Sequence, residues 1–144
     1  MKIEHIGICV AEPLKMGKWY EENLGFKIIH THGNDKDGVN FLYDEKSGFL
    51  LELFRSPDAG ILEFSYMRPI TFHLAIDCKD PLALAKQLES HGAKIIEGSH
   101  NIDHDSEKIL IKDPWGMTLQ LINRNKKLII NKIITETEIS ENLN

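Results

Sequence analysis

Apolar and polar residues follow the same succession twice along this chain. Apolar positions at helical spacing predict helices near residues 13–24 and 81–91. Each helix is preceded by a short apolar run, and alternating apolar and polar positions predict three strands after it. The expected strands after the helices are residues 26–32, 38–44, 49–54, 93–97, 107–112 and 117–123. Each half of the chain therefore has the pattern of one βαβββ module.

The two halves are also related residue by residue. Residues 5–10 align with residues 73–78, and residues 48–54 align with residues 116–122, both at a shift of 68 positions. Such a repeat indicates that one structural unit occurs twice. A unit of about 65 residues buries little apolar surface alone, so we expect the two modules to fold together.

The ends of the helices have typical residues. Pro13 and Pro81 suit the first helical turn, where a missing amide hydrogen costs no intrahelical bond. Asp80 can cap the second helix through its carboxylate. Gly25 and Gly92 suit the left-handed position that follows many helices. These residues support the predicted helix boundaries.

The expected organisation is one domain over residues 1–124, with modules at about residues 1–56 and 71–124. Residues 125–144 lie outside the repeat and join an isoleucine-rich patch to a polar, acidic end. This C-terminal extension could form an added strand or helix, a dimer contact or a frayed tail. The sequence does not choose between these alternatives.

Composition and charge exclude several classes of function. The net charge is -5, and acidic and basic residues are mixed without a basic stripe, which argues against nucleic acid as a partner. No apolar run approaches the roughly 20 residues of a membrane helix, and the N-terminus lacks a signal peptide core. Cys9 and Cys78 each lie in an apolar stretch, as expected of buried thiols in a reducing compartment. We therefore expect a cytoplasmic protein that acts on small molecules.

Four polar residues fall on one face of the predicted strands. Side chains alternate across a strand, and neighbouring leucine, isoleucine and valine residues occupy the opposite, apolar face. The polar residues are His5, Glu52, His73 and Gln120. The repeat relates His5 to His73 and Glu52 to Gln120. A pseudo-twofold axis between the modules would bring all four together.

These four side chains suit one divalent metal ion. Two imidazoles, a carboxylate and an amide oxygen can bind Zn, Ni, Co, Mn or Fe, and they leave a coordination position for water or substrate. A single histidine on a strand is more often a hydrogen-bonded polar group, but four donors at symmetric positions favour a metal site. We predict that His5, Glu52, His73 and Gln120 are its ligands.

Other polar residues have less support as site residues. His30 and His32 share one face of a predicted strand, but they have no counterparts in the second half, so we expect them at the surface. Arg55 or Arg68 could hold an anionic group, although surface positions are expected for both. The segment 56–70 would shape the pocket, and it contains no motif that identifies a substrate. The substrate-binding residues are therefore unknown from the sequence.

Several segments together resemble one superfamily. They are His5-Ile6-Gly7-Ile8, residues 19–26, Leu51-Glu52-Leu53-Phe54, Phe72-His73-Leu74-Ala75, and Asp113-Pro114-Trp115-Gly116 followed by Leu119-Gln120-Leu121. With these segments the chain resembles the vicinal oxygen chelate superfamily over about residues 1–124. That superfamily includes glyoxalase I, methylmalonyl-CoA epimerase, fosfomycin and bleomycin resistance proteins, and extradiol dioxygenases.

The resemblance implies an α+β fold whose two βαβββ modules have curled mixed sheets that enclose a metal-binding cleft. It also implies a homodimer. His5, Glu52 and His73 match the ligand pattern of bacterial glyoxalase I, whereas Gln120 replaces a glutamate that serves there as ligand and base. An amide cannot accept a proton at neutral pH, so the resemblance assigns the catalytic role to Glu52.

The implied activity is that of a metal-dependent lyase or isomerase of the glyoxalase I type. Its substrate would be a small α-oxo compound or thioester, which reacts by metal-assisted enolisation with Glu52 moving the proton. One alternative is a protein of the bleomycin-resistance kind, which sequesters a ligand without catalysis. Enzymes like methylmalonyl-CoA epimerase or the dioxygenases are further alternatives.

Overall fold

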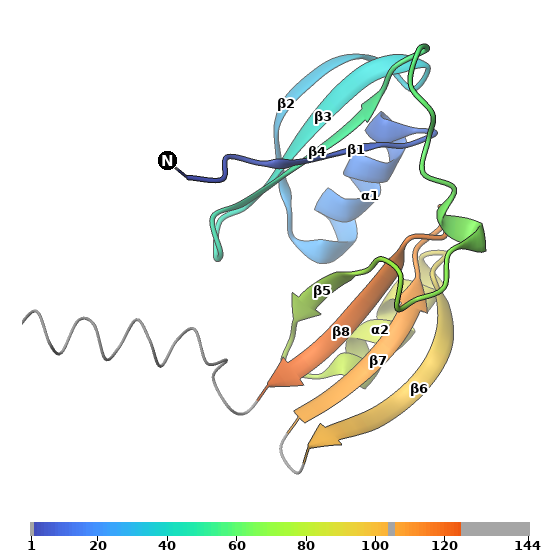
Figure 1. Ribbon diagram of the computed structural model, residues 1–144. Coiled ribbons are helices and arrows are strands. Elements are labelled where there is room, and N and C mark those ends of the chain that lie inside the picture. Colours follow the sequence, from blue (N-terminus) through green and yellow to red (C-terminus); the bar gives the residue numbers. More distant parts are fainter. Residues whose placement is uncertain (1, 104–105, 125–144) are drawn as a thin grey trace, which may run out of the picture. The chain divides into compact units, whose positions relative to one another are not determined.

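The computed structural model describes residues 2–103 and 106–124, and it confirms the two βαβββ modules (Figure 1). The chain divides into two compact units, one up to Tyr66 and one from Met67 onward. Each unit contains one α-helix and one mixed four-stranded sheet. The predicted α+β class is therefore correct.

The first unit contains five elements of its module. They are β1 (Ile6–Cys9), α1 (Pro13–Leu24), β2 (Lys27–Asn34), β3 (Asp37–Asp44) and β4 (Phe49–Arg55). The order of strands in its sheet is β1-β4-β3-β2. A short 3₁₀ helix, η1 (Phe64–Tyr66), follows β4.

The second unit repeats this arrangement. Its elements are β5 (Leu74–Asp77), α2 (Pro81–Ser90), β6 (Lys94–Asp103), β7 (Ser106–Lys112) and β8 (Thr118–Arg124), and the sheet order is β5-β8-β7-β6. In both sheets the first strand pairs in parallel with the last one. Gly7 is the pairing partner of Glu52, and Ala75 is the partner of Gln120. The repeat seen in the sequence is thus a repeat of strand register.

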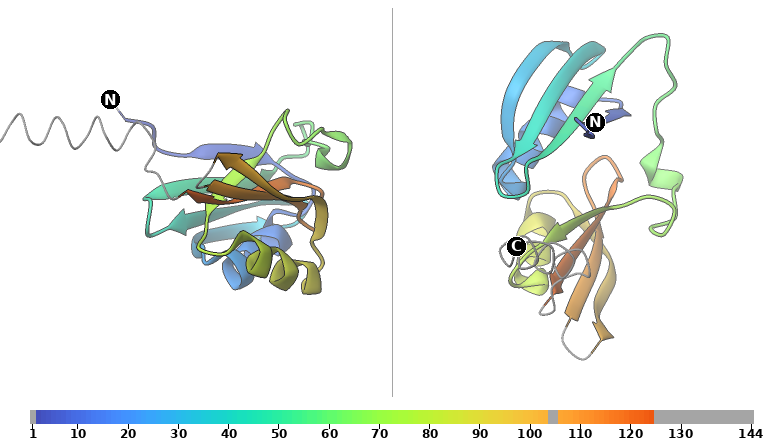
Figure 2. Two further views of the ribbon diagram at one scale, coloured as in Figure 1. Left: turned by 90° about the horizontal axis from the view of Figure 1, so that it is seen from below. Right: turned by 60° about the vertical axis from the view of Figure 1, so that its left-hand side comes forward.

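Each helix covers one face of its own sheet (Figure 2). In the first unit the buried residues include Met16 and Tyr20 of α1 and Leu51 and Leu53 of β4. In the second unit the buried residues include Ala85, Leu88, Ile109, Ile111, Leu119 and Leu121. This burial confirms the alternation that assigned the leucines of β4 and β8 to the apolar face. Ile6 departs from the predicted pattern, because it remains 48% exposed.

The two helices are capped by different means. The Asp80 carboxylate accepts a hydrogen bond from Ala83 N at 2.9 Å, as predicted from the sequence. At α1 the preceding residue, Glu12, makes no side-chain cap bond. Instead Asp35, in the turn between β2 and β3, accepts from Leu14 N at 2.8 Å and from Lys15 N at 3.2 Å. Asp35 therefore ties the β2–β3 turn to the start of α1.

The turn before β8 is organised by a buried carboxylate. Gly116 N donates to Asp113 O at 2.9 Å, which closes a β-turn, and Gly116 has a φ of 84°. The Asp113 Oδ1 atom accepts from both Trp115 N and Met117 N at 2.9 Å. This turn leads the chain into the strand that carries Gln120.

The second strand of the second module is longer than predicted. Alternation predicted a strand at 93–97, whereas β6 extends from Lys94 to Asp103. The pairing with β7 shifts register at three places along β6. Such bulges break the two-residue period, so the pattern alone ends the strand too early.

Three further expectations concern the C-terminal extension, the cysteines and membrane helices. The predicted C-terminal extension, residues 125–144, lies outside them. Cys9 is buried and Cys78 is half-buried, and both are free thiols. Within the part of the chain that the structure describes, no helix is long and apolar enough to cross a membrane.

Replacement of Asp35 by alanine should lower the free energy of unfolding by about 1 kcal/mol, because two amides of α1 lose their acceptor. Urea unfolding followed by circular dichroism measures the change. Asp58→Ala removes an exposed carboxylate after β4 and should change the stability by less than about 0.5 kcal/mol. Equal stabilities of the two variants would exclude the capping role.

Candidate metal and ligand site

His5 and Glu52 come together in the first unit. His5 immediately precedes β1, and Glu52 lies on β4, the parallel neighbour of β1. His5 Nε2 is 3.4 Å from Glu52 Oε2. The two side chains are 35% and 23% exposed, respectively. Register alone therefore places an imidazole and a carboxylate side by side, with access to water.

The other nitrogen of His5 also has an acceptor. His5 Nδ1 forms a hydrogen bond with the carboxylate of Glu4, and the ring packs edge-on to Phe41 with centroids 5.6 Å apart. With its proton on Nδ1, the neutral ring directs the lone pair of Nε2 toward Glu52. Histidine ligands of metal ions are commonly held in this way, through the nitrogen that does not bind the ion.

These contacts raise the pKa of His5 above its ordinary value of 6.5. The largest cause is the hydrogen bond with Glu4, and the negative charge of Glu52 adds to it, while partial removal from water opposes the shift. Because the folded pKa lies above the unfolded one, protonated His5 stabilises the fold below about pH 6.5. That contribution is lost as the pH rises through the folded pKa.

His73 and Gln120 lie in the second unit. His73 is exposed just before β5, and its Nδ1 lies 3.2 Å from the carbonyl oxygen of Pro69. A proton on Nδ1 would leave Nε2 available here as well. Gln120 is half-buried on β8, opposite Ala75 of the neighbouring strand. Both predicted histidines thus have an oxygen partner at Nδ1.

The structure brings His5 and Glu52 together in the first unit. In the second unit, the strand that follows His73 pairs with the strand of Gln120. Across the described ranges, 2–103 and 106–124, no three His, Cys, Asp or Glu side chains are grouped around a common point. The convergence of His5, Glu52, His73 and Gln120 on one ion stays a prediction.

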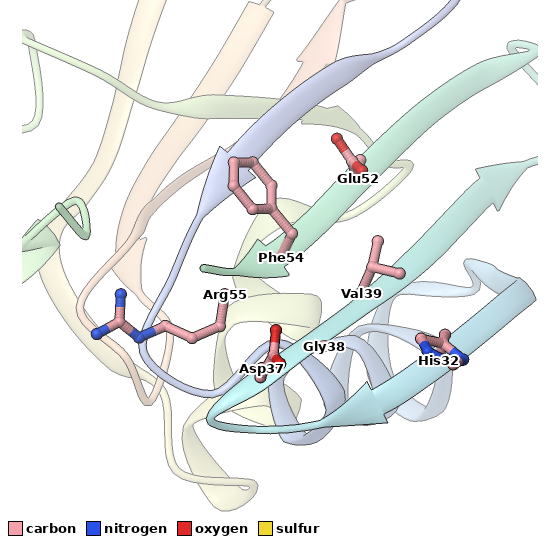
Figure 3. Close-up of a pocket in the computed structure, with 7 residues that line it drawn as sticks. All are labelled: His32, Asp37, Gly38, Val39, Glu52, Phe54 and Arg55. Atoms are coloured by element: carbon pink, nitrogen blue, oxygen red, sulfur yellow. The ribbon is translucent and has the colours of Figure 1, made fainter. Parts of the chain in front are cut away.

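A pocket of about 330 Å³ lies on the face of the first sheet that is turned away from α1 (Figure 3). Its lining residues come from β2, β3 and β4, and they are His32, Asp37, Gly38, Val39, Glu52, Phe54 and Arg55. Strand register explains the grouping, because His32 pairs with Val39 and Val39 pairs with Phe54. Glu52 belongs both to this pocket and to the pair with His5.

Sequence reasoning missed most of this pocket. His32 is exposed, as predicted, yet it lines the pocket. Arg55, which was expected at the surface, is half-buried and also lines the pocket. Its Nη1 donates to Ser56 O at 3.0 Å and to Ala59 O at 3.1 Å, so the guanidinium holds the segment after β4. Alternation along β3 and β4 was the signal for Val39 and Phe54, which share the face of Glu52.

The lining combines an apolar wall with two carboxylates. Val39 and Phe54 form the apolar part, while Asp37 and Glu52 supply negative charge (Figure 3). The Arg55 guanidinium is directed toward backbone carbonyls rather than toward these carboxylates. The pocket therefore suits a ligand with an apolar body and a cationic, hydrogen-donating or metal-bound group beside Glu52.

The sequence matches the family model of the Glyoxalase/Bleomycin resistance protein/Dioxygenase superfamily over residues 2–121. Because the match spans most of the chain, the protein belongs to this superfamily. The paired βαβββ modules agree with that assignment. A comparison with curated proteins found no significant match.

Solved structures share the fold at low sequence identity. A glyoxalase family protein from Bacillus cereus is 12% identical with a TM-score of 0.70, covering 85% of this chain and 93% of its own. An antibiotic binding protein from Streptomyces sp. is 17% identical with a TM-score of 0.64, covering 87% and 97%. A mutant glyoxalase I from Zea mays is 24% identical with a TM-score of 0.65, covering 87% of this chain and 46% of its own.

The imidazole of His5 should titrate above pH 6.5 in the metal-free protein, because two carboxylates stabilise its charged form. Glu4→Gln should lower the His5 pKa more than Glu52→Gln does. NMR titration of the histidine ring resonances measures both changes, with His91 as the internal control. A His5 pKa that is unaffected by Glu4→Gln would contradict the assigned hydrogen bond.

Proposed function

We propose that this protein is a metal-dependent lyase or isomerase of the glyoxalase I type, acting on a small α-oxo compound or thioester. One observation carries the proposal. His5 Nε2 lies 3.4 Å from Glu52 Oε2, and Glu52 also lines the pocket. A nitrogen donor and an oxygen donor therefore lie side by side where a ligand can reach them.

The spacing of this pair fits a shared divalent ion. Zinc bonds to histidine nitrogen and carboxylate oxygen are about 2.0–2.2 Å long, so two donors that meet at the ion with an angle of about 110° are about 3.4 Å apart. The observed separation of 3.4 Å between Nε2 and Oε2 equals that value. The Glu4 carboxylate at Nδ1 supplies the supporting contact that metal-bound histidines usually have.

In the proposed site His73 and Gln120 complete the ligand set. His73 would bind through Nε2, since its Nδ1 faces the carbonyl oxygen of Pro69. Gln120 would bind through its amide oxygen. The ion can be Zn, Ni, Co, Mn or Fe, because all of these accept nitrogen and oxygen ligands. One coordination position or more would remain for the substrate.

Glu52 is the proposed proton carrier. A bound divalent ion supplies Lewis acidity that polarises the substrate carbonyl and acidifies the neighbouring C–H group. Glu52 takes the proton from that carbon and returns it to the adjacent one, which amounts to an enolisation and a reketonisation. Gln120 cannot share this role, because an amide does not accept a proton at neutral pH. The pocket beside Glu52 would hold the reacting carbon atoms.

A second candidate is a protein that sequesters a ligand without reaction. The observation that favours it is Gln120, which leaves the predicted ligand set with a single carboxylate. The apolar wall of Val39 and Phe54 would suit an aromatic or aliphatic ligand.

An epimerase or a dioxygenase would use the same two histidines and Glu52, with iron as the ion in the dioxygenase. The proposal includes a cytoplasmic location and a homodimer.

Purified protein should contain about one divalent ion per chain, because four protein donors suffice to hold an ion beside an open position for the substrate. Plasma mass spectrometry measures the content after expression in medium supplemented with Zn, Ni, Co, Mn and Fe. His5→Ala and His73→Ala should each lower it strongly, whereas His91→Ala, at the end of α2, should not. Wild-type protein that stays empty after reloading would favour the sequestering protein.

Glu52→Gln should keep the ion and lose the reaction, since an amide oxygen can bind a metal but cannot move a proton. We expect the rate to fall at least about 100-fold. Exchange of the substrate α-proton in deuterium oxide, followed by NMR with hemithioacetals and acyl thioesters, measures it. The matched change Glu21→Gln, on the exposed surface of α1, should leave the rate unaltered. Full activity of metal-loaded Glu52→Gln would exclude Glu52 as the proton carrier.

A further inference from the structure

We propose that Gly7 is a positioning residue, whose missing side chain leaves the space in which the Glu52 carboxylate lies beside His5. Gly7 lies on β1 directly opposite Glu52 on β4. A Cβ atom at Gly7 would be 2.6 Å from Glu52 Oε2 and 3.8 Å from Glu52 Cδ. A Cβ contact below 3.0 Å cannot persist, so any side chain at this position would displace the carboxylate.

The backbone does not require glycine at this position. The glycines with positive φ are Gly25, Gly33, Gly48, Gly92 and Gly116, and Gly7 is not one of them. Gly7 lies in a regular parallel pair of strands, where alanine adopts the same conformation. The reason for glycine is therefore the space beside its Cα atom, which the Glu52 carboxylate occupies.

The second module supports this explanation. Ala75 occupies the position that the repeat relates to Gly7, and it pairs with Gln120 in the same parallel register. The strand therefore accepts a Cβ atom in the half that carries the amide. Glycine occurs in the half that carries the Glu52 carboxylate, two residues after His5, which the carboxylate contacts.

A side chain at Gly7 would act on the site rather than on the core. The nearest atom is the end of the flexible Glu52 side chain, and the next is Phe54 Cε1 at 3.5 Å. Both side chains lie on the pocket face, away from α1. The chain can relieve the contact by turning Glu52, so we expect Gly7→Ala to fold with the carboxylate shifted away from His5 Nε2.

The first experiment measures metal affinity, and it rests on the proposed function. Competition with a chromophoric chelator gives the Kd for Zn and Ni of wild-type protein and Gly7→Ala. We expect Gly7→Ala to bind each ion about 10-fold more weakly or worse, the effect of disturbing the support of a metal ligand. Gly98→Ala, where a Cβ meets open space, should bind as wild type does. Ile8→Val, on the buried face of the same strand, controls for lost stability.

The second experiment needs no metal. Thermal unfolding midpoints are compared for metal-free wild type, Gly7→Ala, Glu52→Ala and the double variant. Alanine is a better strand residue than glycine, so Gly7→Ala should not lower the midpoint once Glu52 is truncated. In the presence of Glu52 the same change should raise the midpoint less, because the carboxylate must move. This coupling reports the contact between position 7 and the carboxylate.

The outcomes separate this inference from the proposed function. Coupled midpoints with a weakened Kd in Gly7→Ala support the positioning role. If the midpoints are coupled but the wild-type protein takes up no ion, the metal function is overturned, while the placement of Glu52 by Gly7 stays supported. Uncoupled midpoints, or an unchanged Kd in a metal-binding protein, would overturn the inference about Gly7.

Discussion

The parallel pairing of the first and last strands of each module is the constraint on which the site depends. Parallel strands cannot be joined by a tight hairpin, so the chain between β1 and β4 must form a crossover. That crossover contains α1, β2 and β3, and α1 contributes Met16 and Tyr20 to the core of the unit. His5 and Glu52 meet because this whole segment folds between them, and the register then sets Glu52 opposite Gly7.

Each sheet divides its two faces between stability and chemistry. Burial of Leu51 and Leu53 under α1 supplies the hydrophobic stabilisation, so the other face of β4 can carry polar groups. Glu52 and His5 keep part of their surface in water, which limits the cost of their charges. The raised pKa of His5 comes from neighbouring carboxylates rather than from burial, and it thus reports the local charge of the site.

Duplication of the module left the two halves chemically unequal. Glu52 with Gly7 in one half corresponds to Gln120 with Ala75 in the other, at the same register of β1–β4 and β5–β8. Within the proposed function one half supplies a proton carrier and the other a neutral ligand. With a single carboxylate ligand, the net charge of the ion and its ligands would stay positive. A positive site would stabilise an anionic reaction intermediate.

The sequence by itself determined the two modules, the superfamily and the shared strand face of His5 and Glu52. Periodicity and the internal repeat can both be read directly from the order of residues. Tertiary structure decided the rest. Asp35 caps a helix that precedes it by a strand, Arg55 turns inward to backbone carbonyls, and bulges lengthen β6. These features depend on which chain segments meet in space and on hydrogen-bond geometry, and neither leaves a periodic trace in the order of residues.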